Sequence, residues 1–170
     1  MPSTSGVSVL DVLRATEEIV GKPLFEQACE QLPQSVRDEL ALITAVSWVR
    51  NSLLVEVMRE VARASGRDTE ELVAEAIRSA TARTFTTVWR ALLRFTTDEA
   101  LIKRAPMIYA RSRNCGKVSA RMLSPGVAEV MLTEYPNLTP PELRSLGVGI
   151  QCILELAGRR DVQVSCERKP

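Results

Sequence analysis

The hydrophobic pattern of this chain changes its period once, near residue 117, and this change constrains the fold more than any other feature. Before it, apolar residues recur every three or four positions, as they do on helices. After it, Val118, Ala120 and Met122 alternate with polar residues, and a second alternating run follows Ser124-Pro125-Gly126. Pro and Gly between two alternating runs predict an antiparallel β-hairpin. We therefore expect an α+β protein with a mostly helical N-terminal half.

The stretch after the hairpin predicts a helix and then a strand. Thr139-Pro140-Pro141-Glu142 combines a capping threonine, a proline in the first turn and the glutamate of a capping box. Residues 143–157 are apolar on nearly all sides, which predicts a helix buried against the sheet and against other helices or a second subunit. Residues 161–167 alternate again and predict a C-terminal strand that returns to the hairpin. Together these elements would form a small sheet covered by helices.

The N-terminal segments predict short helices around one domain. The chain has 170 residues, which fits a single domain. Residues 1–6 are small and polar, so we expect a disordered tail. Helical patterns interrupted by Gly21, Pro23 and Pro33 fill residues 7–43 and predict a helical N-terminal cap. Residues 44–167 would then form the α+β core.

The composition excludes several functional classes. The chain contains no histidine, which rules out Ser-His-Asp and Cys-His nucleophiles and histidine-ligated haem. Cys29, Cys115, Cys152 and Cys166 form no C-x-x-C pair, so neither a zinc site nor a disulfide framework is indicated. We therefore predict no metal, no cofactor and no enzymatic activity. A net charge of +1 argues against nucleic-acid binding.

The sequence also predicts a cytoplasmic protein without integral membrane contact. No apolar run approaches the ~18 residues that a membrane span needs. The N-terminus lacks the basic residues and apolar core of a secretory signal.

The strongest apolar face lies before the period change and has two interpretations. Phe85, Trp89 and Leu93 share one helical face, and the simpler interpretation is a stripe that packs in the core. The alternative is that Phe85 and Trp89 line a cavity that accepts an apolar ligand. Met122 and Cys152, on two other elements that we expect to face the core, would complete this candidate pocket.

A basic run between residues 103 and 121 is a second candidate site. It contains no Asp or Glu and six basic residues, which are Lys103, Arg104, Arg111, Arg113, Lys117 and Arg121. Such a run could attract phosphate, an acidic partner or anionic lipid. The alternative is a solvated basic edge that distant carboxylates balance in space.

Several short motifs support a resemblance to a known fold. They are Leu32-Pro33, Ser47-Trp48, the run from Thr87 to Phe95, Ala105-Pro106, Gly116-Lys117-Val118, Ser124-Pro125-Gly126 and the run from Leu154 to Gly158. On these motifs the chain resembles a bacterial, myxobacterial-type domain family. That family is similar to the ligand-binding fold of haem–nitric-oxide sensors, vinyl-reductase-type domains and TRAPP vesicle-tethering subunits.

The resemblance implies a pocket between helices and sheet, used in different branches for haem, aromatic effectors or acyl chains. Most of that chemistry does not carry over. The haem-binding members use a proximal histidine, which this chain lacks. Cys166 stands alone where vinyl-reductase-type domains hold zinc with clustered cysteines. What the resemblance still implies is an apolar cavity and pairing through helices.

Two functions are therefore expected as alternatives. The first is a non-enzymatic sensory or adaptor module, a homodimer that binds an apolar small molecule or acyl group in a helix–sheet pocket. The second is a protein–protein interaction module with a filled core, which would act through helix 143–157 or through the basic run.

Overall fold

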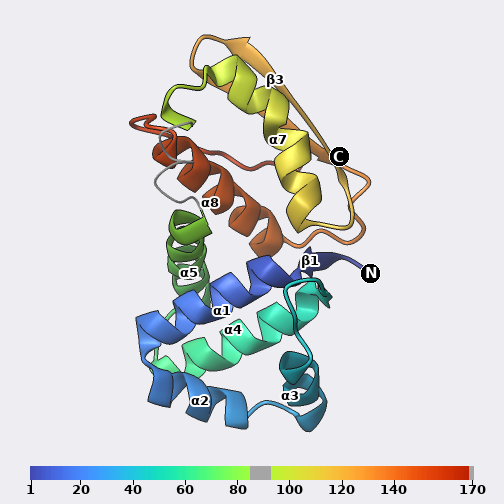
Figure 1. Ribbon diagram of the computed structural model, residues 1–170, viewed down its shortest axis with the longest axis vertical. Helices are drawn as coiled ribbons and strands as arrows, with labels where there is room; N and C mark the ends of the chain where they lie inside the picture. Colours follow the sequence, from blue (N-terminus) through green and yellow to red (C-terminus); the bar gives the residue numbers. More distant parts are fainter. Residues whose placement is uncertain (85–92, 169–170) are drawn as a thin grey trace.

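A computed structural model describes residues 1–84 and 93–168 and confirms the α+β fold class. Helices α1 to α5 form one end of the molecule, and α7, α8 and a hairpin form the other (Figure 1). In chain order the elements are β1 (Ser3–Ser5), α1 (Gly6–Val20), α2 (Lys22–Glu30), α3 (Gln34–Ala41), β2 (Trp48–Arg50), α4 (Asn51–Ser65), α5 (Thr69–Thr84), α7 (Asp98–Ser112), β3 (Lys117–Ser124), β4 (Val127–Thr133) and α8 (Pro140–Leu156).

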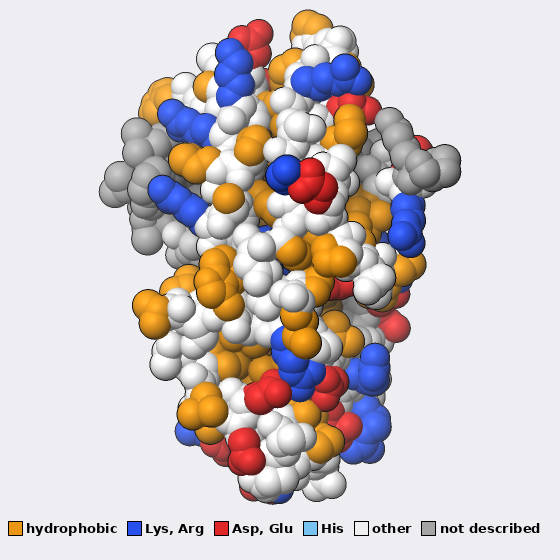
Figure 2. All heavy atoms as spheres, turned by 90° about the vertical axis from the view of Figure 1, so that its right-hand side faces the viewer, with side chains coloured by type: hydrophobic (Ala, Val, Ile, Leu, Met, Phe, Trp, Pro, Cys, Tyr) orange, Lys and Arg blue, Asp and Glu red, His pale blue; other side chains and the backbone are white. Residues whose placement is uncertain are grey.

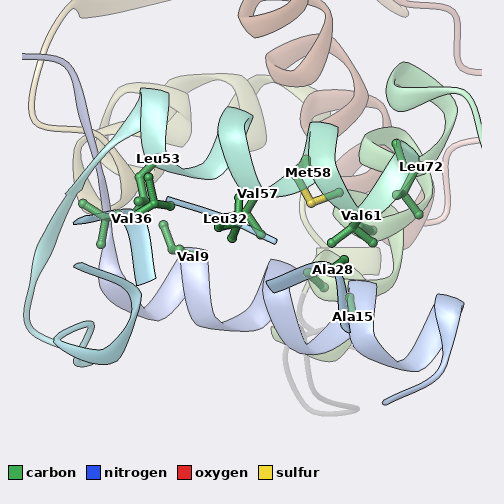
Figure 3. Close-up of a cluster of buried hydrophobic side chains, with 14 residues drawn as sticks. Val9, Ala15, Ala28, Leu32, Val36, Leu53, Val57, Met58, Val61 and Leu72 are labelled. Atoms are coloured by element: carbon green, nitrogen blue, oxygen red, sulfur yellow. The ribbon is translucent and has the colours of Figure 1, made fainter. Parts of the chain in front are cut away.

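The main core lies between α1, α2, α4 and α5. Val57, Val61 and Leu72 are fully buried there, with apolar side chains from every neighbouring helix around them (Figure 3). Ala15 of α1 and Ala28 of α2 are also fully buried, and their small side chains let the helices approach closely. This core is filled by aliphatic side chains, as expected of a close-packed interior.

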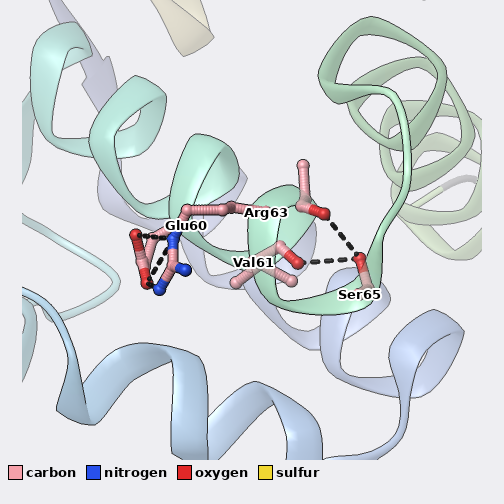
Figure 4. Close-up of polar contacts among 5 residues, drawn as sticks. Glu60, Val61, Arg63 and Ser65 are labelled. Carbon is pink, nitrogen blue, oxygen red and sulfur yellow. Dashed lines mark hydrogen bonds and ion pairs between the residues drawn. The ribbon is translucent and has the colours of Figure 1, made fainter.

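Helix α4 shows how local sequence sets the ends of these helices. Its apolar stripe faces the core, and its C-terminal end falls at Gly66, whose φ of 66° is left-handed. Ser65 Oγ donates to the carbonyl oxygens of Val61 and Ala62, at 2.7 and 3.2 Å (Figure 4). On the solvent side, Arg63 forms an ion pair with Glu60. Residues of its own last turn and Gly66 thus terminate the helix.

The composition of residues 1–6 predicts a disordered tail, but this prediction is wrong. Ser3–Ser5 pairs antiparallel with Trp48–Arg50, and Thr4 stands opposite Val49. The Gly6 amide donates to the Ser47 carbonyl at 2.8 Å. Because this pairing joins residues more than 40 positions apart, the local polarity of the segment gave no sign of it.

The predicted cap and core share one interior. Val9, Ala28 and Val36 come from segment 7–43, yet they belong to the same buried cluster as Val57 and Leu72. The predicted boundary at residue 44 therefore does not separate two packing units.

The hairpin forms as predicted, but the C-terminal strand does not. β3 and β4 pair antiparallel, with Ala120 opposite Val130 and an irregularity between Met122 and Ser124. Helix α7 lies against β3. Residues 161–167 join neither sheet and run along α8 instead, where Cys166 Sγ lies 2.8 Å from the position that a Cβ would take on Gly147. The alternation of this segment reflects half-buried valines facing a helix.

Helix α8 begins as predicted but is less buried than expected. The Thr139 amide donates to Glu142 Oε2 at 2.9 Å, and Thr139 Oγ1 accepts from the Glu142 amide at 3.4 Å. Within α8 only Gly147 and Cys152 are fully buried, and the helix packs mainly on α5. The expectation that it is buried against the sheet is wrong, because α7 covers the hairpin instead.

Candidate interaction surfaces

Two of the four candidate pocket residues, Phe85 and Trp89, lie outside the described residues, and the structure does not bring the other two together. Met122 is half-buried and lines an open hollow of about 560 Å³ with the start of α7 and the hairpin turn. Cys152 is buried on α8 and does not line this hollow, and burial raises the pKa of its thiol.

A small second core lies beside this hollow. Leu93, Leu101 and Ala157 form it, with part-buried Ile153 and Leu154 packed against them. It joins the start of α7 to the end of α8 and is much smaller than the main core.

Arg159 clamps these two helix ends together. Its Nε donates to Asp98 Oδ1 at 2.8 Å, and its Nη2 donates to the Thr96 carbonyl at 2.5 Å. Nη1 donates to the Ala157 carbonyl at 2.5 Å. A guanidinium can hold several acceptors at once because its donors form a rigid fork. Polar contacts therefore supply much of the order in this region.

A polar junction, made of Thr4, Asn51, Tyr135 and Glu142, ties the two ends of the molecule together. Thr4 Oγ1 donates to Asn51 Oδ1 at 2.8 Å. Asn51 Nδ2 donates to Tyr135 Oη at 2.6 Å and to Glu142 Oε1 at 3.0 Å. The Tyr135 hydroxyl also donates to Glu142 Oε1, at 3.1 Å. Side chains from β1, α4 and α8 thus meet in one network.

Burial and hydrogen bonding shift the pKa values of the titratable groups in and near the junction. Burial opposes ionisation of Glu142, but hydrogen bonds from Thr139, Asn51 and Tyr135 outweigh it and hold its pKa below the ordinary value. Burial, reinforced by the Glu142 carboxylate, raises the pKa of Tyr135 far above its ordinary value. Burial likewise raises the pKa of Tyr109 to about 12. Both phenols are therefore protonated at neutral pH and act as hydrogen-bond donors, not as bases.

The predicted basic run divides into a paired and an unpaired part. Lys117 pairs with Glu134 at 2.8 Å, and Arg121 pairs with Glu129 at 2.7 Å, because the hairpin register brings those carboxylates alongside. Arg113 is half-buried near the two tyrosines, where its charge opposes the rise in pKa that burial causes.

The unpaired part is an exposed face of α7. Lys103, Arg104 and Arg111 are exposed and form no ion pair with any residue that the structure describes. Met107 lies between them and is 50% exposed. Residues three, four and eight positions apart lie on one side of a helix. We call these four residues the α7 basic face.

Other exposed apolar residues were missed from the sequence. Figure 2 shows hydrophobic side chains on one side of the molecule, interspersed with Lys, Arg, Asp and Glu. On β4, Val127 and Met131 are 50% and 42% exposed. The available signal was that both are apolar and lie in the polar phase of the alternating run, which Glu129 and Thr133 also occupy.

Further observations bear on the class of protein. The described residues contain no group of three or more His, Cys, Asp or Glu side chains able to hold a metal ion. They also include no helix with the length and apolar character of a membrane span. A scan against family models, a search of curated proteins and a search of solved structures each found no match. The resemblance that the short motifs suggest therefore stays a prediction.

Proposed function

We propose that this protein is a non-enzymatic adaptor module that binds an acidic protein segment along the α7 basic face. The observation that carries this proposal is the set of three exposed cations that form no ion pair with a described residue, whereas the hairpin cations are paired. The simpler interpretation of these three cations is a basic surface that only solvent contacts. However, their one-sided placement around exposed Met107 makes a mixed basic and apolar strip.

The chemistry of this strip favours an acidic peptide. Arg104 and Arg111 can each hold a carboxylate in a two-point hydrogen bond, and Lys103 adds a third positive charge. Met107 supplies a flexible apolar contact of the kind used at adaptable binding surfaces. Anionic membrane surfaces are typically bound by clusters of about four to eight Lys and Arg, whereas the α7 basic face has three.

The absence of histidine from the chain and the protonated tyrosines support a non-enzymatic role. Tyr109 and Tyr135 hold their protons well above neutral pH, so neither serves as a general base. Tyr109 donates to the Cys115 carbonyl at 2.7 Å, which holds the end of α7 against the loop that follows it.

A labelled peptide of alternating Glu and Leu tests the proposal by fluorescence anisotropy. Combined reversal of Lys103, Arg104 and Arg111 to Glu should weaken binding about tenfold or more at low salt, and added salt should reduce the difference. The matched control reverses Lys117 and Arg121, which are already neutralised, and should have a much smaller effect. Equal loss in both variants would overturn the proposal. Binding to phosphatidylserine vesicles but not to the peptide would also overturn it.

A second candidate function is binding of an apolar or acyl ligand at the hollow that Met122 lines. Met122, Leu123 and Pro125 give this hollow an apolar wall. Native mass spectrometry of freshly purified protein, followed by denaturing spectra, tests it. An extra mass that is lost on denaturation, and that Met122→Glu abolishes, would support this candidate. A mass equal to that of the bare chain would contradict it.

A further inference from the structure

Strand β4 has an open backbone edge. It pairs with β3 on one side, and no described strand pairs with its other side. Apart from the β3 ladder, no backbone–backbone hydrogen bond within the described residues involves residues 127–133. Within the part of the chain that the structure describes, alternate amide and carbonyl groups along this edge therefore have no backbone partner. Such an edge is a template for pairing with another strand.

The protections that usually blunt an edge strand are missing from β4. The strand has seven residues with no proline and no lysine, and its one charged residue, Glu129, is paired with Arg121. Among the described helices, α7 packs on β3, and none packs extensively on β4. Residues 117–133, all of which the structure describes, include no fully buried side chain. The apolar face of the hairpin is thus only partly covered.

We propose that β4 pairs antiparallel with β4 of a second copy of this chain, with Val130 on the two-fold axis. This register places Ala128 opposite Leu132 and Glu129 opposite Met131. The six alternating apolar residues of the two β4 strands then form one continuous surface over a four-stranded sheet. A two-fold pairing closes the assembly, since both β4 edges are consumed.

Charge selects this partner and this edge. Pairing about Val130 sets no like charges opposite each other, because the single acid of β4 faces a methionine. Lys117 and Arg121 of β3 are each already paired with a carboxylate of their own chain, so two β3 edges would offer each other no charge complementarity. Pairing of β3 with β4 of another copy leaves a free edge at each end and continues into fibres. The β4 dimer involves no residue of the α7 basic face, so this proposal and the acidic-peptide proposal can be tested independently.

Substitutions at Met131 test the proposal without disturbing the fold, since this side chain is already exposed. Met131→Glu would place a carboxylate opposite Glu129 of the second copy, twice in each dimer, and should weaken dimerisation about tenfold by sedimentation equilibrium. Met131→Lys would instead meet Glu129 and should dimerise at least as tightly as the wild type. Leu42→Glu, at a residue 76% exposed on another part of the molecule, is the control and should leave dimerisation unchanged.

A cross-link tests the register directly. Val130→Cys, in a chain that also carries Cys166→Ser, would place two thiols opposite each other and should give a disulfide-linked dimer on oxidation. Ser119→Cys on β3 is the control and should remain largely unlinked. A wild-type chain that stays monomeric at every concentration would overturn the proposal. Equal weakening by Met131→Glu and Met131→Lys would also overturn it.

Discussion

The two ends of this molecule bury their apolar residues very differently. Helices α1, α2, α4 and α5 enclose a filled core in which Val57, Val61 and Leu72 are fully buried. The end formed by α7, α8 and the hairpin has a small core around Leu101 and Ala157. Hydrophobic burial scales with area removed from water, so the helical end should carry most of the folding stability.

The difference follows from how each end is covered. Each helix of the main core meets at least one other helix along its apolar face. The hairpin is a two-stranded sheet, and α7 is the one described helix that packs extensively on it; such a ribbon is marginally stable without further packing. Polar contacts of Arg159 and of the polar junction hold the thinly packed end in place.

The largest expected effect is a cavity in the main core. Leu72→Ala should lower the free energy of unfolding by about 2–5 kcal/mol, because a fully buried leucine leaves a cavity that cannot collapse. Leu132→Ala on half-buried β4 is the matched variant and should cost about 1 kcal/mol. Urea unfolding measures both. Equal losses would break the contrast between the two ends.

The next effect concerns the entry of the chain into α1. A Cβ on Gly6 would lie 1.9 Å from the carbonyl oxygen of Thr44, so backbone must move. Gly6→Ala should therefore cost about 1–3 kcal/mol, the usual range for overpacking. Thermal unfolding checks this. An unchanged Tm would show that the first turn of α1 does not lie so close to Thr44.

Substitution of a glycine in α8 should raise the stability of the protein instead of lowering it. Gly149 has open space where a Cβ would stand. Gly149→Ala should therefore stabilise the protein by about 0.5–1 kcal/mol through helix propensity. Gly147→Ala is the matched variant, and the nearby Cys166 side chain should reduce its gain. A loss of stability from Gly149→Ala would mean that α8 is covered on that side.

The smallest expected effect is a change in acid sensitivity at the polar junction. Because the folded-state pKa of Glu142 is lowered, its contribution to stability is complete above the unfolded carboxyl pKa of about 4.3. That contribution is lost as the pH falls through the folded pKa. Glu142→Gln should therefore flatten the fall of stability below about pH 4.3, measured by urea unfolding across pH, and Tyr135→Phe should have a partial effect. An unchanged acid slope in Glu142→Gln would contradict this role of the carboxylate.

Features set by local chemistry could be predicted from the sequence. The Pro-Gly turn between alternating runs gave the hairpin, and Thr139 with Glu142 gave the start of α8. The two ion pairs of the basic run follow from the same hairpin register, which sets Arg121 opposite Glu129.

Features set by distant contacts could not be predicted. The pairing of Thr4 with Val49 depends on a segment far along the chain. The alternation of Val162 and Val164 looks the same whether they face a sheet or a helix, and in this fold they run beside α8. No local sequence pattern indicates that Asn51 bonds Tyr135 and Glu142 in the polar junction. The open edge of β4 depends on where α7 and the last segment of the chain pack, which no local pattern records.

Hydrogen–deuterium exchange at two protein concentrations tests the contrast between the ends most directly. The amides of α1, α4 and α5 should show high protection that does not depend on concentration, because they exchange only on global unfolding. The amides of β4 should exchange quickly in dilute protein and become protected in concentrated protein as the second copy covers the edge. If β4 in dilute protein were as protected as α4, the two ends would form one equally stable unit, which would contradict the contrast between them.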